Sequence, residues 1–311
     1  MSRIFFAAAA ATAALASPAF TQEAGFGPLL TPAELMQVQQ TVDPLVIDIR
    51  SDAYAEGHIP GATSAPYDLF RGPADNPGQV PTEEQLTQVL QNIGVEADRP
   101  VVVVHQGTDV TDFGAAARVY WTLKSSGVSE LAILNGGMTA WNEAGLEQSI
   151  EATKAPESSI EVTFSEEWLA TAEDVQQILN AGDKALLLDA RPESFWNGQE
   201  AHAAAARPGT LPQSEYFTHD GWFESGPVIV NAGSAQELAE AQGFTDEEQI
   251  ISFCNTGHWA ATNWFALSEL AGIENVKLYP ESMVGWSNAG YEMANVPGLF
   301  ENLWNQVTGQ N

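Results

Sequence analysis

The sequence predicts an α/β protein with two tandem domains, each a mainly parallel sheet flanked by helices. Three observations predict this class: short strand-like runs alternate with helical stretches, these runs are apolar throughout, and the whole pattern occurs twice. Strands buried on both faces have continuous apolar runs, and strand–helix alternation is typical of parallel sheets. The 311 residues are enough for two domains of ordinary size.

An internal repeat defines the two domains. Three segments of the first copy recur in the same order in the second: LVIDIR (45–50) as LLLDAR (186–191), VVVVH (101–105) as IISFC (250–254), and GMTAWNEAG (137–145) as SMVGWSNAG (282–290). Chance would rarely give three matches in one order. We expect an N-terminal domain at 25–147, a polar linker at 148–160 and a C-terminal domain at 161–311.

Within each copy, the β-branched and apolar runs are expected to be strands and the intervening stretches helices. In the first copy the expected elements are helix 32–40, strand 45–49, helix 83–93, strand 101–104, helix 113–125 and strand 131–134. In the second copy they are helix 172–180, strand 185–188, helix 235–242, strand 250–253, helix 260–270 and strand 276–279.

Cys254 is the only cysteine of the chain. It directly follows the expected strand 250–253, and a glycine-containing turn separates it from the helix expected at 260–270. Ligands of open parallel sheets bind beyond the carboxyl ends of strands. N–H donors and the positive end of a helix dipole favour thiolate over thiol and can hold an anion there. The competing interpretation is a small buried hydrophobic residue. The repeat places His105 at the equivalent position of the first copy.

Residues 1–19 have the pattern of a secretory signal peptide, with Arg3, an apolar alanine-rich stretch and small residues at its end. A buried N-terminal helix is the alternative. We therefore expect a soluble periplasmic or secreted protein, and in an oxidising compartment an unpaired cysteine suggests a reactive thiol or intermolecular pairing. No segment is long enough for a membrane span.

The net charge of −30 argues against nucleic acids and anionic membranes as partners. The acidic residues are dispersed along the chain, as expected for a solvated surface. The five histidines are scattered and one cysteine cannot build a structural zinc site. The sequence therefore predicts neither a metal nor a cofactor.

Further motifs identify a family. Asp48-Ile49-Arg50 precedes GHIPGA (57–62), and a Gly-Gly pair at 136–137 precedes Trp141. With these motifs the chain resembles the two-domain rhodanese sulfurtransferases over almost its whole expected mature length. The resemblance implies an inactive N-terminal domain and a catalytic C-terminal domain. Cys254 would accept a sulfane sulfur as a persulfide and pass it to a thiophilic acceptor, which implies ping-pong kinetics.

The resemblance also implies a substrate-binding loop directly after Cys254. Its backbone N–H groups could converge on the sulfur as an anion nest does; the loop residues are Asn255, Thr256, Gly257, His258 and Trp259. Related phosphatases need an arginine six positions after the cysteine, where Ala260 stands here, so phosphatase activity is not expected.

Positive charge at the expected site is scarce. The family places a second arginine four positions after the Asp-x-Arg arginine, and Phe195 stands there. Arg191 is expected to be largely structural, and Arg207 could supply the missing charge. His258 is either a general acid or anion ligand, or a loop residue turned to solvent. His105 is expected to be structural.

Three functional hypotheses remain. The first is a sulfurtransferase that uses a small thiosulfate-like or mercaptopyruvate-like donor and a small-molecule or thiol-protein acceptor. The second is a non-catalytic protein that binds or carries sulfane sulfur or an oxyanion. The third is a structural duplicate with an inert thiol.

Overall fold

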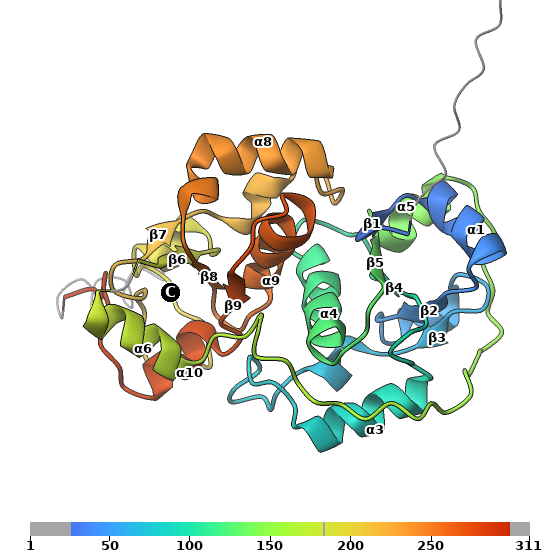
Figure 1. Ribbon diagram of the computed structural model, residues 1–311, viewed down its shortest axis with the longest axis horizontal. Helices are drawn as coiled ribbons and strands as arrows, with labels where there is room; N and C mark the ends of the chain where they lie inside the picture. Colours follow the sequence, from blue (N-terminus) through green and yellow to red (C-terminus); the bar gives the residue numbers. More distant parts are fainter. Residues whose placement is uncertain (1–25, 183, 299–311) are drawn as a thin grey trace, which may run out of the picture.

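The computed structural model describes residues 26–182 and 184–298, so the expected signal peptide lies outside the described residues. Two α/β domains lie side by side, with helix α4 between their sheets (Figure 1). The N-terminal sheet has the strand order β1-β5-β4-β2-β3 and the C-terminal sheet the order β7-β6-β8-β9. All strand pairs within these sheets are parallel. The predicted fold class is confirmed.

The N-terminal domain follows the predicted alternation closely. Its elements are β1 (Leu29–Leu30), α1 (Pro32–Thr41), β2 (Leu45–Asp48), α2 (Ala53–Glu56), β3 (Thr63–Ser64), the 3-10 helix η1 (Tyr67–Phe70), α3 (Glu83–Ile93), β4 (Val101–Val104), α4 (Phe113–Ser125), β5 (Leu131–Leu134) and α5 (Gly137–Glu143). The predicted bounds of α3, β4, α4 and β5 agree with the structure.

The C-terminal domain repeats the order of the elements from α1 to α5, with a longer connection between α7 and β7 (197–214) than between α2 and β3 (57–62). Its elements are α6 (Ala172–Ala181), β6 (Leu186–Asp189), α7 (Glu193–Trp196), β7 (Glu215–Tyr216), the 3-10 helix η2 (His219–Trp222), α8 (Ala232–Gln242), the 3-10 helix η3 (Phe244–Asp246), β8 (Ile250–Phe253), α9 (Trp259–Trp264), η4 (Phe265–Leu270), β9 (Val276–Leu278) and α10 (Ser282–Asn288). The helix expected at 260–270 begins one residue earlier, and its second half, η4, is π-helical.

Local sequence explains where several helices begin and end. Thr31, Thr82 and Thr171 each form a capping box with the residue three positions later, which satisfies free N–H groups of the first turn. Gly94 and Gly182 follow α3 and α6 in the left-handed conformation, which glycine adopts without a steric penalty.

The strand register confirms that the two copies are equivalent. Asp48 of β2 pairs with Val104 of β4, and Asp189 of β6 pairs with Phe253 of β8. The next residue along the chain is His105 in the first copy and Cys254 in the second. Both therefore lie at the carboxyl end of the corresponding strand, as the repeat predicted.

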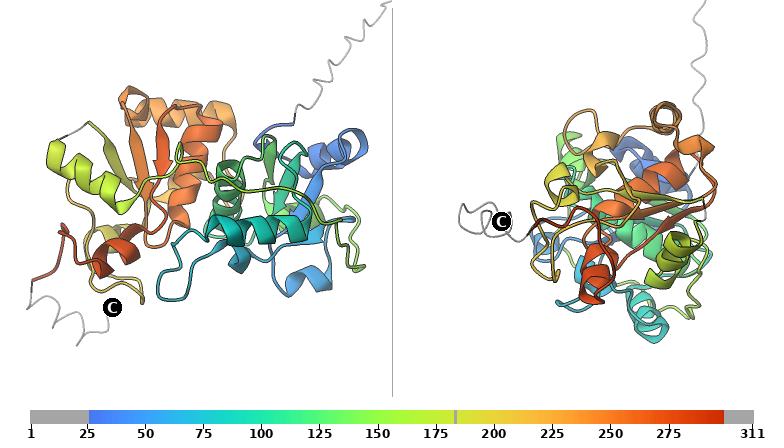
Figure 2. Two further views of the ribbon diagram at one scale, coloured as in Figure 1. Left: turned by 60° about the horizontal axis from the view of Figure 1, so that its bottom comes forward. Right: turned by 90° about the vertical axis from the view of Figure 1, so that its left-hand side faces the viewer.

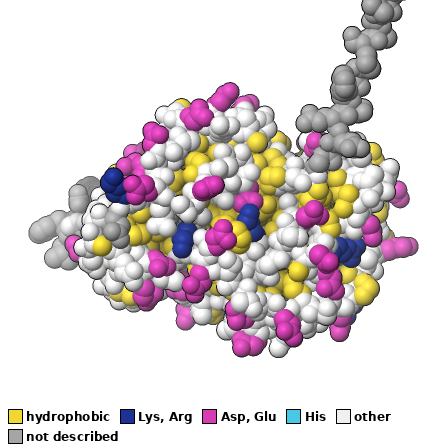
Figure 3. All heavy atoms as spheres, viewed as in Figure 1, with side chains coloured by type: hydrophobic (Ala, Val, Ile, Leu, Met, Phe, Trp, Pro, Cys, Tyr) yellow, Lys and Arg dark blue, Asp and Glu magenta, His cyan; other side chains and the backbone are white. Residues whose placement is uncertain are grey.

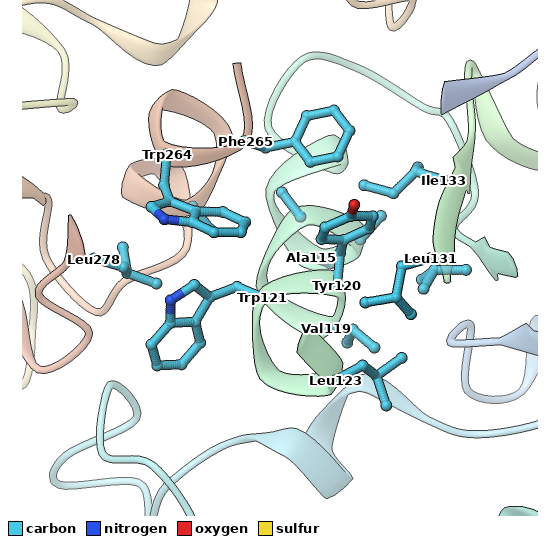
Figure 4. Packing of buried hydrophobic residues seen from close by; sticks show 14 of the residues in the cluster. Ala115, Val119, Tyr120, Trp121, Leu123, Leu131, Ile133, Trp264, Phe265 and Leu278 are labelled. Carbon is cyan, nitrogen blue, oxygen red and sulfur yellow. The ribbon is translucent and has the colours of Figure 1, made fainter. Parts of the chain in front are cut away.

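Helix α4 holds the two domains together. One hydrophobic cluster runs from the N-terminal sheet through α4 to the C-terminal sheet. Trp264 and Phe265 face Tyr120 and Trp121 across the boundary (Figure 4), and the Tyr120 and Phe265 rings lie 5.1 Å apart between centroids. A continuous apolar interface of this kind fixes the relative position of two domains.

The segment that follows the N-terminal domain runs back across that domain. The left-hand view of Figure 2 shows the yellow-green trace crossing from one domain to the other. Gln91 Nε2 donates to the Ile160 carbonyl at 2.8 Å, and the backbone N–H of Val162 donates to Thr87 Oγ1 at 3.0 Å. The expected linker is thus a packed strap along α3.

Candidate active site

Cys254 follows β8 directly and is buried, with 1% of its surface exposed. The N-terminal end of α10 holds its backbone. The Cys254 N–H donates to Ser282 Oγ at 2.9 Å, and the Cys254 carbonyl accepts from the Met283 N–H at 3.0 Å. His105 occupies the same place in the first domain, because its carbonyl accepts from the Met138 N–H at 2.9 Å. The strand end and the following helix therefore position both residues in the same way.

The loops that follow these two residues differ in how their amides are used. In the N-terminal domain the carboxylate of Asp112 accepts from the N–H groups of Gly107 and Thr108 at 2.5 and 3.2 Å. Within the described chain, the N–H groups of residues 255–258 donate to no protein acceptor. Among the described residues no carboxylate accepts from this loop, so its amides are free to bind an anion.

Arg191 contacts the loop after Cys254 through Asn255. Its guanidinium forms a buried ion pair with Asp189 at 2.7 Å and donates to the Gly209 carbonyl at 2.9 Å. Its Nη1 donates to Asn255 Oδ1 at 3.2 Å, which orients the residue after Cys254. Arg50 makes the equivalent bonds to Asp48, Gly57 and Gln106 in the first domain. Both arginines are occupied by the protein itself, which favours the structural interpretation of Arg191.

Gly257 allows the N-terminal domain to approach the loop closely. Its φ is +68°, and a Cβ atom there would collide with Arg118 Nη1 and the Pro280 carbonyl. Arg118 comes from α4, is fully buried, and donates to the Gly257 carbonyl at 3.5 Å and the Gly78 carbonyl at 3.0 Å. Only glycine fits both the backbone conformation and this contact.

His258 bridges the two domains through both ring nitrogens. Its Nε2 lies 2.8 Å from the Thr111 carbonyl, which can only accept, so Nε2 carries the proton. Its Nδ1 then accepts from the Tyr67 hydroxyl at 3.0 Å. Burial, and next the positive charge of Arg71, lower the pKa of His258 to about 4. A neutral histidine with both ring nitrogens bonded to the N-terminal domain matches neither alternative, because it is not a loop residue turned to solvent and neither nitrogen is left for a general acid or an anion ligand.

Aromatic side chains surround the far side of the loop. Trp259 stacks on His219 with ring centroids 5.0 Å apart, and Phe195 meets Trp259 edge-on at 5.9 Å. The Arg191 guanidinium also lies over the Phe195 ring, with Cζ 5.9 Å from the ring centroid. The position where the family resemblance implied an arginine therefore contributes an apolar wall.

Arg207 is bonded away from the positions just described. Its Nη2 donates to the Tyr291 carbonyl and its Nε to the Met293 sulfur, both beyond α10. The Arg207 side chain is exposed, and neither of its hydrogen-bond partners belongs to the loop after Cys254. Among the charged side chains on the face shown in Figure 3, acidic ones prevail and are dispersed, so the anionic surface gives a donor anion no attraction.

Sequence reasoning missed three residues that the structure brings to the site: Tyr67, Arg71 and Arg118. Arg118 had a weak signal, because it is the one basic residue before Lys124 in a helix that is otherwise apolar or small up to Thr122. Tyr67 and Arg71 had none, since only the docking of the two domains places them near Cys254. Among the described residues, no group of His, Cys, Asp or Glu could hold a metal ion.

The fold and the site define a tandem α/β protein with one cysteine-bearing loop and one silent loop. The model of the rhodanese-like domain matches residues 31–144 and 171–289. The chain therefore belongs to the family of proteins with rhodanese-like domains and carries two of them in tandem. The expected family, the tandem rhodanese sulfurtransferases, is confirmed.

Named relatives cover most of the chain. A thiosulfate sulfurtransferase of Pseudomonas aeruginosa is 28% identical over 84% of this chain and 94% of its own length. A 3-mercaptopyruvate sulfurtransferase of Escherichia coli K12 is 27% identical over 75% and 81%. A sulfur carrier protein of Thermus thermophilus, TtuD, is 26% identical over 78% and 87%.

Solved structures share the fold. The anaerobic ergothioneine biosynthesis enzyme of Chlorobium limicola, in complex with trimethyl histidine, superimposes with a TM-score of 0.74 at 21% identity. The match covers 86% of this chain and 70% of that one. Wild-type EanB gives a TM-score of 0.70 at 20% identity, and this chain spans 64% of its length.

Proposed function

We propose that this protein transfers a sulfane sulfur from a small donor to a thiophilic acceptor through a persulfide on Cys254. The observation that carries the proposal is the contrast between the two loops. The loop beside His105 has its amides capped by Asp112, whereas the N–H groups of residues 255–258 are left unbonded beside the only thiol. The relatives named thiosulfate and 3-mercaptopyruvate sulfurtransferase support the same reaction class.

The chemistry follows from the loop. The Cys254 thiolate attacks the outer sulfur of thiosulfate, a new S–S bond forms, and the old S–S bond breaks with its electron pair leaving on sulfite. The two negative charges of thiosulfate and one of the thiolate become one on the persulfide and two on sulfite. The unbonded amides of residues 255–258 are available to stabilise the persulfide anion. A nucleophilic acceptor then attacks the outer sulfur and restores the thiolate.

Intact mass tests the persulfide. After mixing with thiosulfate or 3-mercaptopyruvate, the protein is expected to gain one sulfur, about 32 Da. The Cys254→Ser variant is the control and should gain none. Absence of the adduct with both donors would refute the persulfide on this residue.

A carrier that stores sulfur without turning over is the second candidate, because one relative is named a sulfur carrier. Both candidates predict the 32 Da adduct, so turnover separates them. Repeated release of thiocyanate from thiosulfate and cyanide supports the enzyme. A single equivalent released per Cys254 supports the carrier, whose acceptor would be a thiol protein.

We also propose that the protein is exported to the periplasm or beyond, since residues 1–19 have a signal-peptide pattern. In the described ranges no helix has the length and apolarity to cross a membrane. The mature protein recovered from a bacterial host should lack the N-terminal segment by mass. Retention of the full sequence in the cytosolic fraction would refute export.

A further inference from the structure

Two arginines of the N-terminal domain lie beside the active-site loop and form no ion pair with a carboxylate of the described residues. Of the lysines and arginines in the described chain, six form an ion pair with a carboxylate, although the whole chain has a net charge of −30. Arg71 and Arg118 are not among them. Both are close to Tyr67, since the Arg71 guanidinium lies 5.2 Å from its ring centroid and Arg118 acts electrostatically on its hydroxyl.

The hydrogen bonds of these arginines leave buried N–H groups unused. Arg118 donates from Nη1 to the Gly257 carbonyl and from Nη2 to the Gly78 carbonyl, and the first of these bonds links the two domains. Its Nε is buried and has no partner, and neither has the buried Nη1 of Arg71. A structural bridge between domains explains the two carbonyl contacts, but it leaves these two donors unexplained, and a buried donor without an acceptor is costly.

Electrostatics gives the same result. Burial, and next the like charge of Arg71, lower the pKa of Arg118 to about 9. Two neighbouring guanidinium groups of one sign, partly removed from water, are unfavourable unless an anion lies between or beside them. Negative charge has the opposite effect, because Tyr67, Cys254 and Glu281 each raise the pKa of Arg118, so an anion beside the two arginines stabilises their charged form.

The C-terminal domain has no free cation for this role at the positions that the sequence singled out. Arg191 is consumed by Asp189, Arg207 is bonded to Tyr291 and Met293, and the place of the second arginine is taken by Phe195. The unpaired positive charge near Cys254 therefore comes from the other domain.

We propose that Arg71 and Arg118 form the anion-binding half of the donor site and select a dianionic, thiosulfate-type sulfane donor. Two guanidinium groups match two negative charges: Arg118 offers its unbonded Nε, and the Nη1 of Arg71 is likewise free to donate to the oxygens of a sulfonate-like group. A donor with a single carboxylate, such as 3-mercaptopyruvate, would neutralise only one of them. The proposal rests on the proposed sulfur transfer for its substrate class, and it explains why the N-terminal domain is present although its own loop is silent.

Thiosulfate binding to the Cys254→Ser variant tests the proposal without any sulfur transfer. Calorimetric titration at low ionic strength should show binding, and 3-mercaptopyruvate should bind more weakly. Adding Arg71→Gln or Arg118→Gln should weaken thiosulfate binding tenfold or more, on the order expected for a lost charge-assisted bond. Arg99→Gln, which removes an arginine paired with Asp43 on the surface of the same domain, is the control and should change nothing.

Arg118 is fully buried, so a loss of binding in Arg118→Gln counts only if thermal unfolding shows that this variant is folded. Arg71 is only partly buried, so thiosulfate binding by Arg71→Gln tests the proposal by itself if Arg118→Gln unfolds. Undiminished binding in Arg71→Gln, equal or tighter binding of 3-mercaptopyruvate, or no thiosulfate binding by Cys254→Ser would each overturn the proposal. If thiosulfate binds as expected but the wild-type protein gains no sulfur, the anion site stands and the proposed function fails.

Discussion

At the scale of the residue, Gly257 determines how closely the two domains meet. It combines a left-handed backbone with a contact to a buried guanidinium, so both its φ and its missing side chain are needed. Asn255, two residues earlier, is held by Arg191, and His258, one residue later, by Thr111 and Tyr67. The loop around Cys254 is thus held from both domains, and its backbone is pre-organised before a donor binds.

Gly257→Ala should destabilise the fold and slow persulfide formation. Alanine at φ +68° costs about 1 kcal/mol in backbone conformation, and the collision with Arg118 and Pro280 raises the total loss to roughly 2–3 kcal/mol. Urea unfolding and the rate of the mass increase with thiosulfate measure the two effects.

Gly243→Ala is the matched control, because Gly243 has φ +79° but open space around the Cβ position. This substitution should lower the free energy of unfolding only by the backbone cost of a left-handed alanine and should leave the rate of persulfide formation unchanged. Equal effects of the two substitutions would mean that the contact with Arg118 is unimportant.

At the scale of the element, the connection between strand and helix separates the silent loop from the reactive one. The connection from β4 to α4 spans residues 105–112 and ends in Asp112, which caps its own loop. The connection from β8 to α9 is shorter, 254–258, and contains no carboxylate. Burial lowers the pKa of His105 to about 4, so the side chain in the silent loop is a neutral imidazole with no bonded partner in the described structure.

A cysteine placed in the silent loop should therefore stay unreactive. In the double variant His105→Cys, Cys254→Ser, the loop amides remain bound to Asp112 and cannot stabilise a thiolate or persulfide. We expect no 32 Da increase with thiosulfate, while circular dichroism shows an intact fold. Sulfur uptake at a rate near that of the wild-type protein would show that loop amides are not what separates the two sites.

At the scale of the whole molecule, the domains share one hydrophobic cluster and the site lies where they meet. Tyr67, Arg71 and Arg118 come from one domain, while Cys254 and His258 come from the other. His258 forms a polar contact between the domains that is sensitive to acid, because the ring must stay neutral to keep both of its hydrogen bonds. The positive charges of Arg71 and Arg118 oppose its protonation.

Acid should weaken the protein through His258. Its pKa is about 4 in the folded protein and near 6.5 when unfolded, so the unfolded chain takes up the proton first as the pH falls. The free energy of unfolding should decrease from pH 6.5 to pH 4, by up to about 1.4 kcal/mol per pH unit for this group. Urea unfolding at several pH values measures it.

Two variants separate His258 from other acid-sensitive groups. His258→Gln should show a shallower dependence over this range, whereas Tyr67→Phe removes one hydrogen bond but keeps the titrating ring and should keep the slope. An unchanged slope in His258→Gln would place the acid sensitivity elsewhere, for example at His105, whose pKa is lowered in the same direction.

The strands and helices were largely predictable because their signals are local. The apolar runs at β4, β5 and β8 and the helices α3 and α4 lie where the pattern placed them, and the repeat located Cys254 opposite His105. The two-residue strands β1, β3 and β7 were not predicted, since pairing with a neighbour, rather than composition, makes such short segments strands.

The sequence by itself determined the fold class, the duplication and the one thiol at a strand end, because periodicity and repetition are written along the chain. The tertiary structure alone decided which cations serve that thiol. Arg71, after η1, and Arg118, on α4, are far from Cys254 in sequence, and only the packing of the two domains against each other brings them to the loop. Electrostatic complementarity depends on distance in space, and neither residue type nor spacing along the chain reveals it.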